Sequence, residues 1–370
     1  MNKYFHIFLA LSLFASFSAS AYERGKTRNV NGKEITLKNK CISMIILPER
    51  AGRISSLSLT DKNLELLTPG KVSVVEETPL FSYSSDNMMG VYELIWRAKI
   101  NGTVGMEYTV NANKITFTGK FYGNTEVDLT REVTLVPDAL AIEVKSTFTN
   151  TAKTDQSLAP WIHLVGAPLT SASLPLAPGT HRRDGFGLIG KNSIPKLFTF
   201  GKHNNYLPPG DNWVALRRVG KNVVWALRLP EGTLDKEGVF YSWGNGKDIQ
   251  SAEVIWPKHA LKPQGKFTIN YSLEIFDGLD TINALWGNTG LSLTMKDGKA
   301  VLNFVASRKE PARKGVLEWK TGSKDSGKYP FAIPALAPGK SAEVILPLKA
   351  IPETALIRES STGKTITLFF

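Results

Sequence analysis

The segment SAEVIWPKHALKPQGKFTINYSLEIF, residues 251–276, holds a carboxylate, a tryptophan and a histidine ahead of a Pro-Gln-Gly turn. Its first carboxylate, Glu253, has two interpretations: a solvated strand residue, or the general base of a catalytic site. Successive side chains of a strand point to opposite faces. Because Val254 is expected to face inward, we expect Glu253 on the opposite face.

His163 and His181 are two further candidates for chemistry. His163 follows Pro160-Trp161 in an otherwise apolar strand, where a histidine is either a hydrogen-bonded core residue or an acid in a site. His181 lies in GTHRRDGFG, a polar loop bracketed by glycines that also carries Asp184. Loops of this kind often carry ligand contacts, and the alternative is a solvated basic surface.

Aromatic side chains offer another kind of ligand contact, one that suits sugars. The C–H face of a sugar stacks on a ring, while polar side chains fix its hydroxyls. Four of the eight tryptophans stand beside loop or polar residues and are the candidates for stacking: Trp161, Trp213, Trp243 and Trp256. For each of them, a place in the core is the competing interpretation. Three others lie inside alternating strands and are expected in the core: Trp96, Trp225 and Trp319.

Several other chemistries have no support in the sequence. It contains no Walker glycine-lysine loop, no dinucleotide-type glycine fingerprint, no Gly-x-Ser-x-Gly elbow and no His-Glu-x-x-His helix. The histidines and the single cysteine show no metal-ligand spacing. We therefore expect no metal and no cofactor.

Apolar and polar residues alternate with a period of two along most of the chain. The alternation is clear in KITFTGKFYG, NWVALRRVGKNVVWALRLP and KFTINYSLEIF, which are rich in β-branched and aromatic residues. Pro137-Asp138, Gly220-Lys221-Asn222 and Gly265 stand where hairpins would reverse. No amphipathic helix of three turns is found, so the predicted fold class is all-β.

The spacing of the strands divides the chain into two units. Up to about residue 280 the strands are too numerous for one small sandwich, so residues 22–280 are predicted to form a large antiparallel two-sheet structure. From Thr281 onward, short strands at close spacing, with Asp297-Gly298 as a hairpin turn, predict an immunoglobulin-like sandwich over residues 281–370. This second unit lacks the Cys…Trp…Cys core of true immunoglobulin domains.

Residues 1–21, MNKYFHIFLALSLFASFSASA, combine an early lysine, an apolar run and small residues at Ala19 and Ala21. This pattern predicts a signal peptide cleaved before Tyr22 and a periplasmic or secreted mature chain. The alternative, a membrane anchor, needs a longer apolar run. No later segment is expected to cross a bilayer. Cys41 is the only cysteine, so the chain has no internal disulfide, and we expect Cys41 to be buried.

The formal net charge of +12 favours acidic partners such as anionic polysaccharide, nucleic acid or an anionic envelope surface. The basic residues are scattered among acidic ones without a dense run, so a solvated, soluble surface is the alternative. Nucleic acid is not expected as a partner of an exported chain.

Three segments, in this order along the chain, resemble the galactose-mutarotase-like superfamily. ISMIILPERAGRISSLSLTDKNLELL resembles its opening strands, and REVTLVPDALAIEVKSTFTNTAKTDQSLAPWIHLVG resembles its paired strands and histidine-bearing strand. Residues 251–276 resemble its closing segment. The resemblance covers residues 30–277 and implies a β-supersandwich, a fold shared by aldose epimerases, carbohydrate-binding proteins and several polysaccharide-lyase domains.

The resemblance also implies roles for Glu253 and His163. In an aldose epimerase a base takes the proton of the anomeric hydroxyl and an acid protonates the ring oxygen, and these two residues occupy the matching positions. Where mutarotases present an Asn-Arg pair to the sugar, this chain has DNMM, residues 86–89, and no arginine. The family's second active-site histidine has no clear counterpart, although His181 or His203 could replace it. A standard galactose mutarotase is therefore disfavoured.

Two functions stay open. The first is an exported carbohydrate-binding protein that recognises a sugar or a glycan, with acidic polysaccharides among the candidates. The second is an epimerase-like or lyase-like enzyme that uses Glu253 as base and His163 as acid. The sequence leaves the oligomeric state open.

Overall fold

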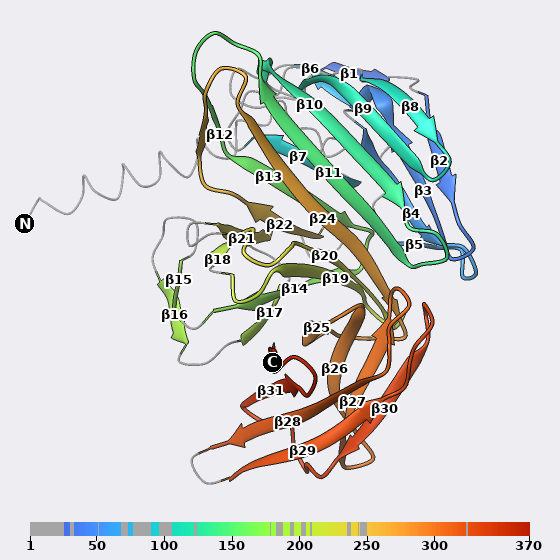
Figure 1. Cartoon of the computed structure of the whole chain (residues 1–370), viewed down its shortest axis with the longest axis vertical. Helices are drawn as coiled ribbons and strands as arrows, with labels where there is room; N and C mark the ends of the chain where they lie inside the picture. The colour runs from blue at the N-terminus through green and yellow to red at the C-terminus, as the bar shows by residue number, and fades with distance from the viewer. Residues whose placement is uncertain are drawn as a thin grey trace, which may run out of the picture.

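A computed structural model shows that all but one of the regular elements among the described residues are β-strands (Figure 1). The exception is a 3-10 helix, η1 (Pro48–Arg50). The predicted all-β class is confirmed. The structure describes residues 26–29, 33–50, 52–67, 73–76, 90–95, 106–121, 124–177, 179–182, 188–192, 196–200, 205–207, 209–234, 238–242, 244, 250–322 and 325–370.

The first large sheet has nine antiparallel strands in the order β17-β14-β19-β20-β24-β11-β10-β9-β8. Its strands are β8 (Glu107–Asn111), β9 (Lys114–Phe121), β10 (Asn124–Leu135), β11 (Ala141–Asn150), β14 (Thr170–Leu176), β17 (Lys196–Phe200), β19 (Trp213–Arg218), β20 (Val223–Arg228) and β24 (Lys266–Asp277). The predicted turns at Pro137-Asp138 and Gly220-Lys221-Asn222 connect β10 to β11 and β19 to β20.

The second large sheet has eleven strands, in the order β16-β15-β18-β21-β22-β13-β7-β4-β3-β2, with β5 paired to β4. These strands are β2 (Ile35–Lys38), β3 (Ile42–Leu47), β4 (Arg53–Leu59), β5 (Leu64–Glu65), β7 (Gly90–Ile95), β13 (Pro160–Gly166), β15 (Gly179–Arg182), β16 (Leu188–Asn192), β18 (Asn205–Leu207), β21 (Val239–Ser242) and β22 (Gln250–Ile255). Two small sheets pair β1 (Lys26–Asn29) with β6 (Ser73–Glu76) and β12 (Gln156–Leu158) with β23 (His259–Leu261).

The two large sheets form a sandwich around one apolar core. In β13, Ile162 and Leu164 belong to this core, and in β22 Val254 does. Because side chains alternate between the faces of a strand, His163 and Glu253 point to the outer face of the eleven-stranded sheet. The period-two pattern thus sets the direction of both chemical candidates.

One ion pair is enclosed between the two sheets. Glu93 of β7 pairs with Arg131 of β10, and both side chains are only 1% exposed. The Glu93 carboxylate also accepts hydrogen bonds from Tyr271 Oη at 2.8 Å and from Ser146 Oγ at 3.0 Å. Buried ions need such partners, because the loss of hydration otherwise exceeds their mutual attraction. These four residues therefore tie the two sheets together through polar contacts.

The C-terminal unit is a sandwich of two four-stranded antiparallel sheets. One sheet contains β25 (Ala284–Trp286), β26 (Thr289–Lys296), β27 (Lys299–Ala306) and β30 (Ser341–Leu346), and the other contains β28 (Arg313–Thr321), β29 (Asp325–Ile333), β31 (Thr354–Glu359) and β32 (Thr365–Leu368). The predicted turn at Asp297-Gly298 joins β26 to β27, with φ angles of 51° and 75° that suit a tight hairpin. The boundary at residue 281 and the immunoglobulin-like assignment stay predictions.

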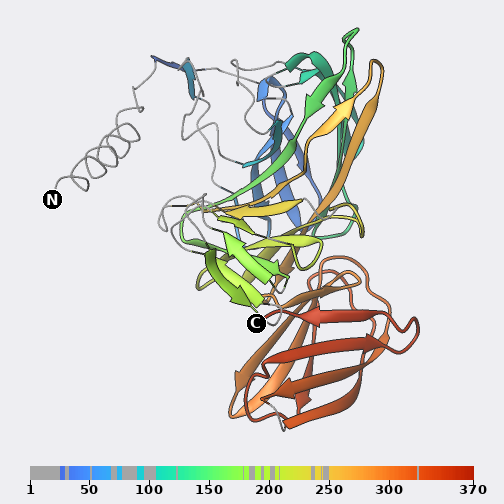
Figure 2. The same cartoon turned by 90° about the vertical axis from the view of Figure 1, so that its left-hand side faces the viewer.

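The two units meet along a packed seam, which Figure 2 shows at the end of the large sandwich. A separate apolar cluster joins Trp213 and Phe276 of the nine-stranded sheet to Val305 and Phe369 of the C-terminal unit. The chain end contributes a backbone hydrogen bond of 2.9 Å from Leu197 N to Phe370 O. Apolar and polar contacts together fix one unit on the other.

Candidate functional site

His163 of β13 and Glu253 of β22 lie directly opposite each other on neighbouring antiparallel strands. Their Nε2 and Oε2 atoms are 3.7 Å apart, and the two residues are 3% and 2% exposed. The solvated-strand interpretation of Glu253 is therefore wrong. Ser251, two residues earlier on the same face of β22, donates a hydrogen bond to Oε1 of Glu253.

Aromatic rings enclose the imidazole of His163. The ring of Tyr92, its neighbour on β7, stacks on it with 4.8 Å between centroids and 11° between planes. The ring of Trp161, two residues earlier on β13, also contacts it, with a centroid separation of 3.8 Å. On the Tyr92 ring the guanidinium of Arg53 lies 3.8 Å from the centroid, a cation–π contact. Tyr241 of β21 completes the row, paired with Glu253 in register.

Burial dominates the electrostatics of the pair. It raises the pKa of Glu253 to about 8, although hydrogen bonds from Ser251 and Trp161 act in the opposite direction. Burial also lowers the pKa of His163 well below its ordinary value, and the charge of Arg53 adds to this effect. Both shifts favour the neutral form, since an ion loses its hydration at such a position.

The protonation states define what this pair can do. At neutral pH Glu253 holds its proton and His163 has an unprotonated ring nitrogen. In this state the carboxylic acid is the proton donor and the imidazole the acceptor, the reverse of the roles that the family resemblance implies. Conversion to a carboxylate base needs either a higher pH or a ligand that stabilises the charge.

Of the other candidates whose side chains the structure describes, it brings only Trp161 to this pair. Trp213 is 1% exposed and packs against Phe369 in the seam, and Trp256 is 3% exposed and donates a hydrogen bond of 3.2 Å to Thr233 O. Both rings are therefore buried, and neither has a recorded contact with His163 or Glu253. Trp225 is a core residue, as predicted.

Several of the other candidates fall wholly or partly outside the described residues. The backbone of His181 belongs to β15, where it pairs with Gly190 of β16, so it lies in a strand and not in a loop. Asp184, Trp243, His203, Trp96, residues 1–21 and the DNMM segment at 86–89 lie outside the described residues.

Four residues of the site were not predicted from sequence: Arg53, Tyr92, Tyr241 and Ser251. Ser251 could have been found, because residues two apart on a strand share a face. The other three reach His163 and Glu253 through the pairing of β4, β7, β13, β22 and β21. Arg53 brings a positive charge close to His163 through its contact with the Tyr92 ring.

Among the described residues no group of three or more histidine, cysteine, aspartate or glutamate side chains is arranged to hold a metal ion. Within the same part of the chain, no helix has the length and apolar character needed to cross a membrane.

The fold and the site together define a large antiparallel β-sandwich with a buried His–Glu pair on the outer face of one sheet. No protein-family model matches the chain, and no curated protein matches its sequence.

Among solved structures, the chain is similar to a galactose mutarotase-like protein from Lactobacillus casei, with 12% identity, a TM-score of 0.49, and coverage of 66% of this chain and 100% of that one. It is also similar to a galactose mutarotase related enzyme from Lactobacillus acidophilus, with 11% identity, a TM-score of 0.49, and coverage of 67% and 99%. A TPR-domain containing protein from Parabacteroides distasonis matches with 13% identity and a TM-score of 0.49, over 65% of this chain but only 46% of that protein.

Proposed function

We propose that this chain is an exported carbohydrate-binding protein of the galactose-mutarotase-like type, which binds a sugar at the His163–Glu253 pair. The proposal rests on one observation above all: an imidazole and a carboxyl group lie 3.7 Å apart on one sheet face, between aromatic rings. Polar groups that fix hydroxyls next to rings that stack on C–H faces are what a sugar site requires. The ordered sequence segments that resemble the superfamily support the same function.

Binding is favoured over catalysis by the charge state of the pair. A protonated Glu253 and a neutral His163 both form hydrogen bonds to hydroxyls at neutral pH. A base that takes an anomeric proton must be ionised, and with a pKa of about 8 only roughly a tenth of Glu253 is ionised at pH 7. Because both side chains and the rings beside them are nearly excluded from solvent, sugar entry requires the residues that cover this face to move.

The test is binding of a panel of aldoses and uronic acids, measured by calorimetry and by the change in tryptophan fluorescence. We expect a sugar that binds the wild type to lose at least tenfold in affinity in His163→Ala. His259→Ala is the matched control, because His259 stacks on Phe267 with 4.3 Å between centroids, away from the pair. Failure of the whole panel to bind, or equal binding by the two variants, contradicts the proposal.

The second candidate function is an epimerase-like enzyme, favoured by the direct opposition of His163 and Glu253. Polarimetry or NMR exchange on the same sugars tests it. Glu253→Gln is expected to abolish anomer interconversion while sugar binding persists, and Glu107→Gln, on an exposed edge strand, is expected to leave the rate unchanged. A wild type that accelerates no sugar rules out this function and leaves the binding proposal standing.

A further inference from the structure

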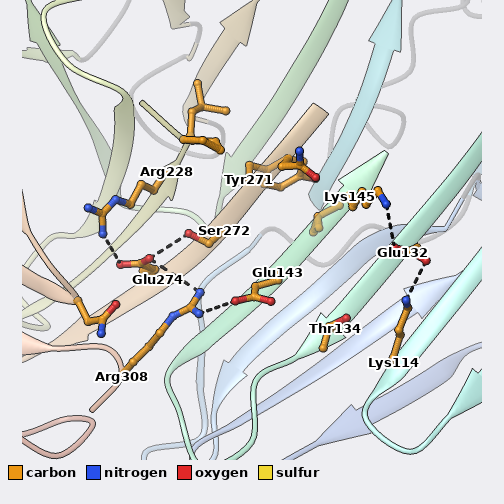
Figure 3. Close-up of a pocket in the computed structure, with 15 residues that line it drawn as sticks. Lys114, Glu132, Thr134, Glu143, Lys145, Arg228, Tyr271, Ser272, Glu274 and Arg308 are labelled. Atoms are coloured by element: carbon orange, nitrogen blue, oxygen red, sulfur yellow. Dashed lines mark hydrogen bonds and ion pairs between the residues drawn. The ribbon is translucent and has the colours of Figure 1, made fainter. Parts of the chain in front are cut away.

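A groove of about 570 Å³ crosses the outer face of the nine-stranded sheet where this sheet meets the C-terminal sandwich (Figure 3). Its floor comes from β9, β10, β11, β24 and β20, which are consecutive in the sheet, and Asn288 and Arg308 add a wall from the C-terminal unit. Neighbouring strands are ~4.8 Å apart, so five strands extend over roughly 19 Å. Ligand sites often have this volume and often lie between packed units.

The charged side chains of the groove are held by one another. At one end Lys114 Nζ lies 2.8 Å from Glu132 Oε1, and Lys145 Nζ lies 3.9 Å from the other oxygen of the same carboxylate. In the middle, Arg308 donates a hydrogen bond of 2.5 Å to Glu143. Figure 3 shows these pairs along the groove. Each of these side chains therefore has an oppositely charged partner within the groove.

Glu274 organises the end of the groove that lies at the seam. Its carboxylate is 3% exposed and accepts hydrogen bonds from Ser272 Oγ at 3.0 Å and from Ser307 Oγ at 3.3 Å. Arg228 and Arg308 lie 3.7 Å and 3.9 Å from it. Because Ser307 and Arg308 belong to the C-terminal unit, this buried carboxylate connects both units and fixes the shape of the groove.

The composition of the lining specifies the class of ligand. Four basic and three acidic side chains are interspersed, with the hydroxyl or amide groups of Thr134, Asn270, Ser272 and Asn288 between them. Such a surface has donors and acceptors throughout and a nearly balanced charge. A phosphate or sulfate would meet three carboxylates, whereas the hydroxyls of a sugar donate to carboxylates and accept from ammonium and guanidinium groups.

We propose that this groove is a second binding site, which takes a neutral oligosaccharide chain. A smaller pocket of about 180 Å³, lined by Asp211, Glu231 and Lys364, shares Arg228 and Leu229 with the groove and extends it along the seam. The groove and the His163–Glu253 pair are on the outer faces of different sheets, with the core between them. The proposal of a second site therefore does not rest on the function proposed for that pair.

Calorimetry on the full chain with neutral tetra- to hexasaccharides tests this site. We expect Asn270→Ala and Thr134→Ala each to weaken binding by roughly tenfold, the loss that one or two hydrogen bonds produce. Thr118→Ala is the matched control for Thr134, because Thr118 is exposed on neighbouring β9 and does not line the groove. Glu253→Gln is expected to bind the chains as tightly as the wild type, and binding is expected to change little with salt.

Four results would overturn the second site. The first is that no neutral oligosaccharide binds. The second is that Asn270→Ala and Thr134→Ala bind as tightly as Thr118→Ala. The third is that only acidic chains bind, with a steep dependence on salt, since this would assign the groove to anions. The fourth is that Glu253→Gln loses oligosaccharide binding while Asn270→Ala and Thr134→Ala keep it, since this would place the oligosaccharide at the His163–Glu253 pair.

Discussion

The stability of the folded protein should depend on pH through Glu253. Its pKa is about 8 in the folded state, against 4.5 for an unburied glutamate. The folded state therefore keeps a proton that the unfolded state releases, so stability falls as pH rises from about 4.5 to about 8 and is level above that. Each pH unit in this window costs roughly 1.4 kcal/mol, and the full window about 5 kcal/mol.

Glu253→Gln isolates this effect, because glutamine has the shape of the protonated acid and never ionises. As the pH rises, the variant is expected to become more stable than the wild type. The difference between their free energies of unfolding should grow by about 2 kcal/mol between pH 6 and pH 8. Denaturant unfolding of both proteins at several pH values measures this difference. Glu107→Gln, on fully exposed β8, is the control and should show no such growth. A difference between Glu253→Gln and the wild type that is independent of pH would show that Glu253 is ionised and solvated, and would refute the burial argument.

Three other predictions concern stability and processing. Burial and the charge of Arg53 lower the pKa of His163, so below about pH 6.5 the unfolded state binds a proton that the folded state does not bind. The stability of the folded protein should therefore fall as the pH drops below about 6.5. His163→Gln should remove this loss, as measured by thermal melts. Arg131→Met should lower the free energy of unfolding by about 3–5 kcal/mol, because Glu93 would be left as a buried, unpaired charge. The double variant that also carries Glu93→Leu should recover part of this lost stability. Equal losses in the single and double variants would contradict the prediction. Mass spectrometry of the exported protein should find Tyr22 as the first residue, and recovery of intact Met1 there would disprove cleavage.

The strands, several turns and the faces of the chemical candidates could be predicted from sequence because they depend on neighbouring residues. Alternation in β22 placed Val254 in the core and Glu253 on the other face, as the structure has them. The turn at Asp297-Gly298 needs only two residues with positive φ, which Asp and Gly adopt readily.

The protonation and the burial of the site could not be predicted in this way, because they arise from contacts between distant segments. Arg53 acts on His163 across Tyr92, which requires the register of three strands. Trp213 stands beside polar residues in the sequence, yet the C-terminal unit buries it through Phe369. Local polarity therefore says little about a tryptophan whose partner lies 156 positions further along the chain.

The enclosed ion pair lies between the two proposed binding sites, and it connects them residue by residue. Tyr92 stacks on the site histidine at the outer face of one sheet, while its neighbour Glu93 points inward to Arg131 and Tyr271. Asn270, next to Tyr271, lines the groove on the outer face of the other sheet. We expect this contiguous network to couple the two sites energetically. A sugar at the first site should then change the oligosaccharide affinity of the groove in the wild type, and Tyr271→Phe, which removes only the hydroxyl of the network, should reduce that change. Equal groove affinities with and without the first sugar would show that the two sites act independently and that the enclosed pair serves the fold alone.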